Sequence, residues 1–258
     1  MFIKFFFHLD IGQQRYTITY LYHMIKEEKI LVFTACYNEA ENIEKLIKDI
    51  KKFLPSSSIL IIDDNSPDKT KEKIIELKRE ISQINLIVRD KKMGLDTAHK
   101  LAYDYSIKNN YNLLITMDAD LSHDPKELNN FVKNLRENSF VIGSRYIEGG
   151  KCLMKGSRLI MSKVGNLVIK FVSRINCNEF TTSYRGFNID KLVGFHLNDV
   201  KESGYSFFMG TVFEVNRKKF NIKEIPITFA DREKGVSKIP KLEILRTLIN
   251  LLIHIFKK

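Results

Sequence analysis

The sequence predicts an α/β fold in which a mainly parallel sheet is covered by helices on both faces. Strand-like and helix-like segments alternate along residues 30–142, which is the pattern of parallel strands joined by crossover helices. The strand-like segments are apolar almost throughout, as expected of strands buried on both faces. Polar clusters occupy positions 34–39, 63–68 and 118–124, around the ends of three such segments. Because ligands bind beyond the carboxyl ends of parallel strands, these clusters predict the place of a functional site.

The individual elements follow from hydrophobic periodicity and from capping residues. We expect strands over residues 30–34, 59–62, 86–89, 113–117 and 140–142. We expect helices to begin at Asn38, Ser66, Thr97 and Pro125. Asn38 with Glu41 fits a capping arrangement, and Ser66 before Pro67 fits an N-cap followed by a proline in the first turn.

The second half of the chain is less regular. After Gly143 we expect a glycine-rich turn, a basic helix around residues 158–171 and a segment over 181–187, which together should form the second wall of a cleft. The formal net charge of the whole chain is +11. Such an excess suits a nucleic acid, an anionic membrane surface or a phosphate-rich substrate, and charge alone does not choose among them.

Length and cysteine content limit the class of protein. A chain of 258 residues with 44% hydrophobic residues is long enough for one sizeable domain. The three cysteines, Cys36, Cys152 and Cys177, have no CxxC spacing, which argues against a disulfide framework and against a thiolate metal site. We therefore expect the reducing cytoplasm as the compartment.

The two ends of the chain are expected to differ from its centre. We predict an N-terminal extension over residues 1–23 that the fold does not need, a catalytic domain over 24–241 and an amphipathic helix over 242–258. No stretch reaches the roughly 18 to 20 uninterrupted apolar residues of a spanning helix. The last segment carries one polar stripe, formed by Glu243, Arg246, Asn250 and His254. This pattern suits a helix that lies in a membrane interface, or one that packs on the domain or on a partner.

Asp118 and Asp120 are the candidate site residues that indicate a function most clearly. They follow an apolar strand and are separated by Ala119, and because strand side chains alternate, both carboxylates should point to the same side. Two carboxylates can hold one hard cation, and oxygen ligands favour Mg²⁺ or Mn²⁺ over zinc. Such an ion neutralises the charge that grows on a diphosphate leaving group. The sequence therefore predicts a metal site, the alternative being a structural or capping role.

Further polar clusters could complete the site. Asp63 and Asp64 are adjacent carboxylates that need donors, such as base or ribose groups, unless they only form a turn or cap a helix. The segment 37–39 would flank the same nucleotide. Residues 231–238 place a glycine among cationic side chains and can wrap a phosphate, unless they form a solvated loop. Further cations of the second half are Arg145, Arg158 and Arg185.

Five segments resemble those of the dolichol-phosphate (polyprenol-phosphate) mannosyltransferases, which are family 2 type glycosyltransferases. They are residues 37–43, 62–68, 118–125, 143–150 and 231–238. They occur in that family's order and span roughly residues 30–240. The resemblance implies a type A glycosyltransferase fold, GDP-mannose as the donor, and a polyprenyl phosphate, dolichyl or undecaprenyl, as the acceptor.

The resemblance also implies roles for individual residues. Contacts with the nucleotide are implied for Cys36, Tyr37, Glu39, Ile62, Asp64 and Ala119. Asp118 and Asp120 would hold the metal and the diphosphate, with Ser122 where many relatives place a glutamine ligand. The acceptor phosphate would meet Arg145, Arg158 and Ser162. Phosphate contacts from a closing loop are implied for Arg232 and Lys238, and the catalytic residues would be Asp118, Asp120 and Arg232.

Some positions depart from the family pattern. Cys36 replaces a proline, Asp96 replaces a glycine, and Ser183 replaces the glycine before an aromatic–arginine pair. Residues 208–210 are Phe-Met-Gly, where relatives usually carry a glutamine and then a glutamate. These departures bear on the donor sugar more than on the reaction class, so a UDP-sugar donor of the glucose type is the alternative.

The implied reaction is an inverting displacement at the anomeric carbon by a lipid phosphate oxygen. A phosphate monoester has a second pKa of about 6, so the nucleophile is already anionic and needs no strong protein base. The expected partners are a nucleotide-sugar, a polyprenyl phosphate and the cytoplasmic face of a membrane as a peripheral contact, with a membrane subunit as a further candidate. No nucleic acid is expected, because an RNA-binding aromatic signature is missing. The rival class is a non-catalytic nucleotide-binding module.

Overall fold

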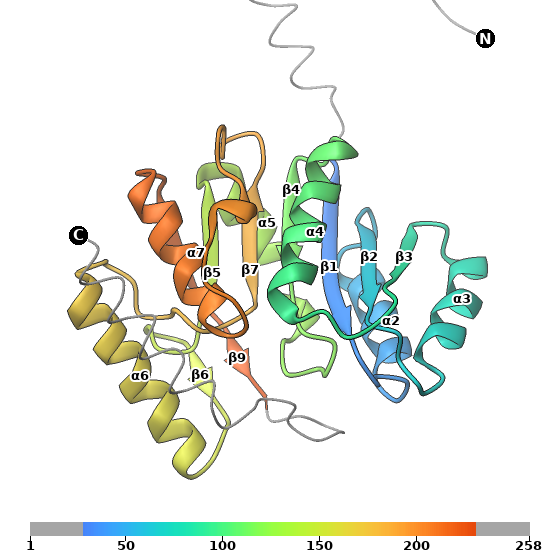
Figure 1. Ribbon diagram of the computed structural model, residues 1–258, viewed down its shortest axis with the longest axis horizontal. Coiled ribbons are helices and arrows are strands. Elements are labelled where there is room, and N and C mark those ends of the chain that lie inside the picture. The colour runs from blue at the N-terminus through green and yellow to red at the C-terminus, as the bar shows by residue number, and fades with distance from the viewer. Residues whose placement is uncertain (1–27, 231–258) are drawn as a thin grey trace, which may run out of the picture.

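The computed structural model describes residues 28–230 and has a seven-stranded sheet at its centre (Figure 1). The strand order is β3-β2-β1-β4-β7-β5-β8. These strands are β1 (Ile30–Cys36), β2 (Ser58–Asp63), β3 (Ile84–Val88), β4 (Leu113–Thr116), β5 (Phe140–Ser144), β7 (Arg185–Asn188) and β8 (Ile222–Pro226). A separate parallel pair consists of β6 (Lys151–Cys152) and β9 (Thr228–Phe229). The predicted extension over 1–23, the tail helix over 242–258, Arg232 and Lys238 lie outside the described residues.

The sheet is mainly parallel, which confirms the predicted fold class. β1 pairs in parallel with β2 and with β4, β2 with β3, and β5 with β8. β7 is antiparallel to both of its neighbours, β4 and β5. The sequence of β7 is Arg-Gly-Phe-Asn, which shows no hydrophobic alternation, so the pattern analysis did not identify it as a strand.

Helices cover both faces of the sheet. They are α2 (Ile43–Phe53), α3 (Thr70–Glu80), α4 (Leu95–Lys108), α5 (Leu128–Glu137), α6 (Ser157–Ser173) and α7 (Ser206–Arg217), with short 3₁₀ turns η1 (Pro125–Glu127) and η2 (Leu197–Asp199). The apolar residues of α2, α3 and α5 form one core cluster with one face of the strands. Those of α4 and α7 form a second cluster with the opposite face. Among residues 28–230, no helix is both long enough and apolar enough to cross a membrane.

Two helices begin later than the capping residues predicted. α2 begins at Ile43 rather than at Asn38, and α3 begins at Thr70 rather than at Ser66. Asn38 has a φ of 56°, a left-handed conformation that asparagine tolerates, and its N–H donates to Ser66 Oγ at 2.9 Å. The start of α3 is capped by Asp68, which accepts from the N–H of Thr70 at 3.0 Å. The two expected N-caps therefore join the first two strand-to-helix loops to each other.

Candidate active site

The three polar clusters predicted from the sequence meet at one edge of the sheet. β1 lies between β2 and β4, and all three run in the same direction. Cys36 is in register with Asp63, and the N–H of Asp64 donates to the carbonyl of Cys36 at 3.1 Å. On the other side of β1, the N–H of Met117 donates to the carbonyl of Phe33 at 3.0 Å. The carboxyl ends of these strands therefore bring the acidic clusters side by side.

The two carboxylates at the end of β2 already have donors within the protein. Asp63 is fully buried and accepts from the N–H of Ser66 at 3.0 Å. Asp64 is buried and forms an ion pair with the buried guanidinium of Arg89. The N–H of Met93 donates to the second oxygen of Asp64 at 3.3 Å. Ser66 and Arg89 therefore supply donors to the two carboxylates from within the protein, and a nucleotide contact of Asp64 stays a prediction.

The residues expected to surround the nucleotide differ in their solvent exposure. Tyr37 and Glu39 are partly exposed, and Lys92 Nζ lies 4.8 Å from the centre of the Tyr37 ring. Cys36 and Ile62 are both buried, but they belong to the core clusters on opposite faces of the sheet. Their side chains therefore pack into different clusters, and a contact of either residue with a base stays a prediction.

The loop after β4 presents Asp118 and Asp120. Asp120 is buried and accepts from the N–H of Ser122 at 3.1 Å and from its hydroxyl at 2.6 Å. Asp118 is more open, with 31% of its side chain exposed, and accepts from the Ser183 hydroxyl at 2.5 Å. Leu121 has a φ of 63°, a strained backbone for a branched side chain that is more often found at functional sites. The loop therefore holds one buried carboxylate and one that is partly exposed, each hydrogen-bonded to a serine.

His123 is a fully buried residue that supports this loop through a backbone hydrogen bond. The sequence analysis did not identify it. Its Nδ1 accepts from the N–H of Asp118 at 3.0 Å, so the ring proton is on Nε2, which lies 3.4 Å from Thr182 Oγ1. The ring stacks on Tyr184 with centres 4.8 Å apart. Burial lowers the pKa of His123, although the charges of Asp118 and Asp120 act to raise it. The imidazole is therefore neutral near pH 7, and the available signal was only its place three residues after Asp120.

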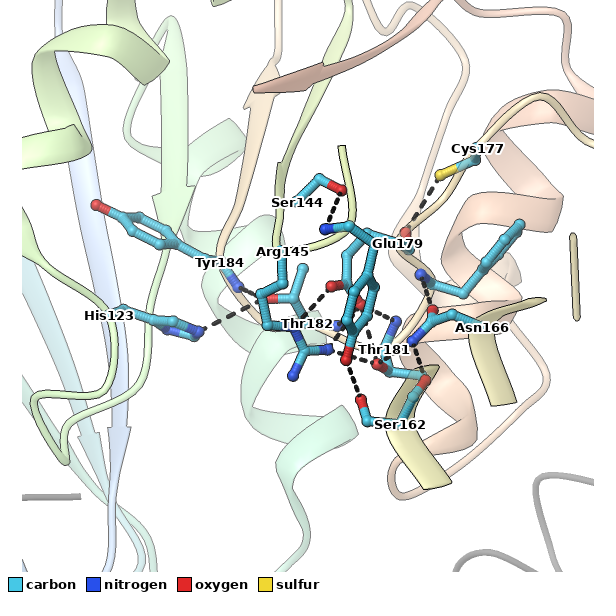
Figure 2. Close-up of polar contacts among 12 residues, drawn as sticks. His123, Ser144, Arg145, Ser162, Asn166, Cys177, Glu179, Thr181, Thr182 and Tyr184 are labelled. Atoms are coloured by element: carbon cyan, nitrogen blue, oxygen red, sulfur yellow. Dashed lines mark hydrogen bonds and ion pairs between the residues drawn. The ribbon is translucent and has the colours of Figure 1, made fainter. Parts of the chain in front are cut away.

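A buried ion pair forms the second wall of the site (Figure 2). Arg145 follows β5 and donates from Nε and Nη2 to the two oxygens of Glu179, at 2.7 and 2.8 Å. Glu179 is fully buried, and it also accepts from the N–H of Thr181 at 3.1 Å and from that of Thr182 at 3.2 Å. Burial acts to raise the pKa of Glu179, but Arg145 holds it below its ordinary value. The sequence analysis missed Glu179, because its partner is 34 residues away and no periodicity connects them.

One of the residues expected at the acceptor phosphate, Arg145, lines a cavity between α6 and the end of β5. Arg145, Lys163 and Lys170 line this cavity of about 380 Å³ together with two asparagines, Asn166 and Asn178. Arg158 lies exposed in the first turn of α6. Ser162, on the same helix, accepts from the hydroxyl of Tyr146 at 2.6 Å (Figure 2). Only Arg145 of the three predicted residues lines the cavity, whereas two lysines that were not predicted do.

Arg185 has a structural role rather than a phosphate-binding one. Its side chain is 1% exposed and donates to the backbone carbonyls of Phe180, Thr182 and Phe208. Burial lowers its pKa to about 9. Arg185 therefore connects the 180–182 segment to α7.

The ligands around Asp118 and Asp120 suit a hard divalent cation. His123 uses Nδ1 for a backbone bond, so the groups left to face an ion are carboxylate and hydroxyl oxygens. Within residues 28–230 no group of three or more His, Cys, Asp or Glu is arranged to hold a metal. An ion at this site would therefore need substrate phosphates or water to complete its shell, which is the usual binding mode of Mg²⁺. Ser122 already donates to Asp120, and its role as a third ligand stays a prediction.

Comparison with known proteins agrees with this geometry. The sequence profile described as glycosyl transferase family 2 matches residues 31–193. The chain belongs to this family. It is 32% identical over 212 residues to an undecaprenyl-phosphate mannosyltransferase of Micrococcus luteus, a match that covers 82% of this chain and 87% of the relative. It is also 32% identical over 215 residues to a polyprenol monophosphomannose synthase of Mycolicibacterium smegmatis, covering 82% and 81%.

Solved structures support the fold of this glycosyltransferase. Glucosyl-3-phosphoglycerate synthase from Mycobacterium tuberculosis, in complex with Mn²⁺, UDP and glucosyl-3-phosphoglycerate, superposes with a TM-score of 0.65. The match covers 96% of this chain and 86% of that one, at 14% identity. At this identity the likeness concerns the fold alone, and it confirms the type A architecture that the five segments implied.

Proposed function

We propose that this glycosyltransferase moves mannose from GDP-mannose to a polyprenyl phosphate, with inversion at the anomeric carbon and with the help of Mg²⁺ or Mn²⁺. The observation that carries the proposal is the position of Asp118 and Asp120. They stand between a sheet edge that offers Tyr37 and Asp64 and a cationic cavity that contains Arg145. The names of the two relatives, both of which transfer mannose to a polyprenyl carrier, support the choice of sugar and acceptor.

The donor would lie across the carboxyl ends of β1, β2 and β4. Tyr37, Glu39 and Asp64 would meet the nucleoside, with the backbone of Ala119 close by. Asp118 and Asp120 would hold the divalent ion, which when bound neutralises charge on the departing diphosphate. Ser183 and Ser122 orient the two carboxylates through their hydroxyl groups, so little rearrangement is needed when the donor binds.

The acceptor phosphate would approach from the side of the cationic cavity. Lys163 offers an exposed charge, and Lys170 donates to Asn178 Oδ1 at 2.7 Å. Arg145 is held in place by Glu179. A phosphate monoester carries more than one negative charge at neutral pH, so its oxygen can attack without a general base from the protein. Positioning and charge neutralisation are then the main contributions of the enzyme. Arg232 and Lys238 would add phosphate contacts, and the protein would work as a peripheral enzyme at the cytoplasmic face of a membrane.

The test is transfer from a panel of nucleotide-sugars. The protein is mixed with Mn²⁺, a polyprenyl phosphate, and GDP-mannose, UDP-glucose or UDP-galactose, and the lipid product is identified by mass spectrometry. We expect a hexosyl lipid from GDP-mannose and none when EDTA is in excess. A product from UDP-glucose alone would keep the reaction class and overturn the donor. Full activity in EDTA would overturn the role of Asp118 and Asp120.

A further inference from the structure

The outer face of α6 is the most apolar exposed surface of the described chain. Thirteen large hydrophobic residues are exposed within residues 28–230, and six of them lie on this one helix. The most exposed are Phe171 at 82%, Leu167 at 67%, Ile160 at 63% and Val164 at 52%. Exposed apolar side chains that gather in one place mark a binding surface more often than scattered ones do.

These four residues form one continuous stripe along the helix. Their spacing of four, three and four residues places them on the same side of a helix with 3.6 residues per turn. The residues that α6 buries against the rest of the protein, Asn166, Ile169 and Ser173, lie on the opposite side. Figure 1 shows α6 at the rim of the molecule, beside β6 and away from the central sheet. The stripe therefore faces away from the body of the protein.

The charge around the stripe has one sign. Residues 151–178 contain six Lys or Arg and no Asp or Glu, although acidic residues are frequent elsewhere in the chain. Lys163 and Lys170 are seven residues apart, so they lie on one flank of the stripe, and both line the cavity next to Arg145. An apolar stripe with a basic border is the pattern of a helix that lies in the interface of an anionic membrane.

We propose that α6 docks the protein on an anionic lipid surface, with Ile160, Val164, Leu167 and Phe171 inserted below the headgroups. The lysines of the flank would then meet lipid phosphates at the level of the cavity. This extends the proposed function, since a lipid acceptor could reach Arg145 without leaving the membrane, but docking itself does not depend on which sugar is transferred.

Charge favours lipid over a second copy of this chain as the occupant of this face. A symmetric dimer would place the same patch against itself, and two segments with six cations and no acid would repel each other. Residues 231–258 of this chain carry seven Lys or Arg against three Asp or Glu, but their apolar part, residues 242–256, carries one charge of each sign. Packing of that part on the stripe is therefore an outcome that a probe at position 171 has to detect. An anionic lipid surface is the occupant that complements the patch.

Binding to vesicles tests the proposal directly. The full-length protein is floated with phosphatidylcholine vesicles that contain or lack phosphatidylglycerol. We expect the double variant V164S/F171S to bind the anionic vesicles at least about tenfold more weakly than the wild type, because it removes two inserted apolar side chains. The matched control is Val193→Ser, since Val193 is 80% exposed but far from α6 in the sequence; its binding should not change. Equal binding by V164S/F171S and the wild type would overturn the proposal.

A probe on the stripe separates a lipid from a protein occupant. Phe171→Cys is made in a Cys152→Ser background, because Cys152 is half-buried, and is labelled with an environment-sensitive fluorophore; Cys36 and Cys177 are buried and therefore protected. We expect the emission of a solvent-exposed probe in buffer and a blue shift only when anionic vesicles are added. A blue-shifted emission without vesicles would mean that protein covers the stripe, either a second copy or another part of the chain, and would overturn the proposal.

A water-soluble acceptor distinguishes a failure of docking from a failure of the proposed function. With a short-chain prenyl phosphate in the absence of vesicles, V164S/F171S should transfer sugar at the wild-type rate, because neither residue lies at the cavity. Loss of vesicle binding with this transfer unchanged supports docking by α6. If the wild type binds vesicles but transfers no sugar to any acceptor, the proposed function fails and the docking surface stands.

Discussion

The two walls of the site are built by different kinds of interaction. The first wall consists of the ends of β1, β2 and β4, where the backbone of a parallel sheet brings Tyr37, Asp64 and Asp118 to one edge. The second wall consists of the β5 end and the segment 178–184, held by the Arg145–Glu179 pair and its threonine neighbours. Regular hydrogen bonding places the first wall, and individual buried side chains place the second. Mutations in the first wall should therefore lower mainly the activity, and mutations in the second wall should lower mainly the stability of the fold.

The largest expected effect on activity is in the first wall. Asp118→Asn and Asp120→Asn should each lower kcat by roughly 10²- to 10³-fold or more, because in the proposed reaction each carboxylate would face the leaving diphosphate and its cation. The fold should be almost unchanged, since asparagine keeps the shape of the side chain. Steady-state kinetics and thermal unfolding of the same samples check both statements.

The matched control for this prediction is Asp124→Asn. Asp124 lies in the same loop, caps η1 through the N–H of Lys126 at 3.0 Å, and is outside the pair. Asparagine is also a good N-cap, so activity should stay near the wild-type level. Loss of activity in this control equal to that in Asp118→Asn would mean that the whole loop, and not the pair, is sensitive.

In the second wall, the largest expected effect is on the free energy of unfolding rather than on the rate of the reaction. Glu179→Gln leaves the guanidinium of Arg145 buried without its counter-charge, which typically costs about 3–5 kcal/mol of unfolding free energy. Glu44→Gln is the matched control, because Glu44 pairs with Lys48 at 2.6 Å and both side chains are largely exposed, and exposed pairs contribute little to stability. Urea unfolding of both variants measures the difference. Equal small losses would mean that burial of the Arg145–Glu179 pair has no energetic consequence.

The same pair predicts how stability depends on pH. Arg145 holds the pKa of Glu179 below its ordinary value in the folded protein. The stabilisation is therefore present above the pKa of the unfolded chain, about 4.3, and is lost as the pH falls through the lower, folded-state value. Between pH 7 and pH 3 the wild type should lose more unfolding free energy than Glu179→Gln does. If the unfolding free energies of the two proteins fell in parallel as the pH is lowered, this prediction would be contradicted.

The sequence predicted the first wall far better than the second. Apolar strand runs and the polar residues that follow them are local signals, so the strand ends and the clusters at Asp64 and Asp118 could be located in advance. Glu179 could not, because a buried pair between positions 34 residues apart leaves no local pattern. The charge of Asp64 was recognised but its partner Arg89 was not, for the same reason. Helix starts were misplaced where capping side chains bond across loops, as Ser66 does with Asn38.

A smaller effect is expected from His123, which connects the two walls. We expect His123→Phe to weaken the apparent affinity for Mn²⁺ by about 10- to 100-fold, as is typical of residues that orient metal ligands. His123→Asn should recover part of this loss, because its side-chain oxygen can still accept from the N–H of Asp118. Activity measured against Mn²⁺ concentration separates this change from a general fall in kcat. Equal effects of both substitutions would mean that only the volume of the ring matters.

The smallest effect is expected at Ser122, and it decides between two roles. If the hydroxyl only donates to Asp120, Ser122→Ala removes one hydrogen bond of about 0.5–1.5 kcal/mol, while the backbone N–H still donates to the same oxygen at 3.1 Å. Activity at saturating Mn²⁺ should then fall by less than about tenfold. A change confined to the Mn²⁺ requirement, and restored by Ser122→Gln, would instead make the residue a ligand of the ion. The first result would leave Asp118 and Asp120 as the metal ligands that this loop supplies, and would place the neutral His123 and Ser122 together as the groups that orient them.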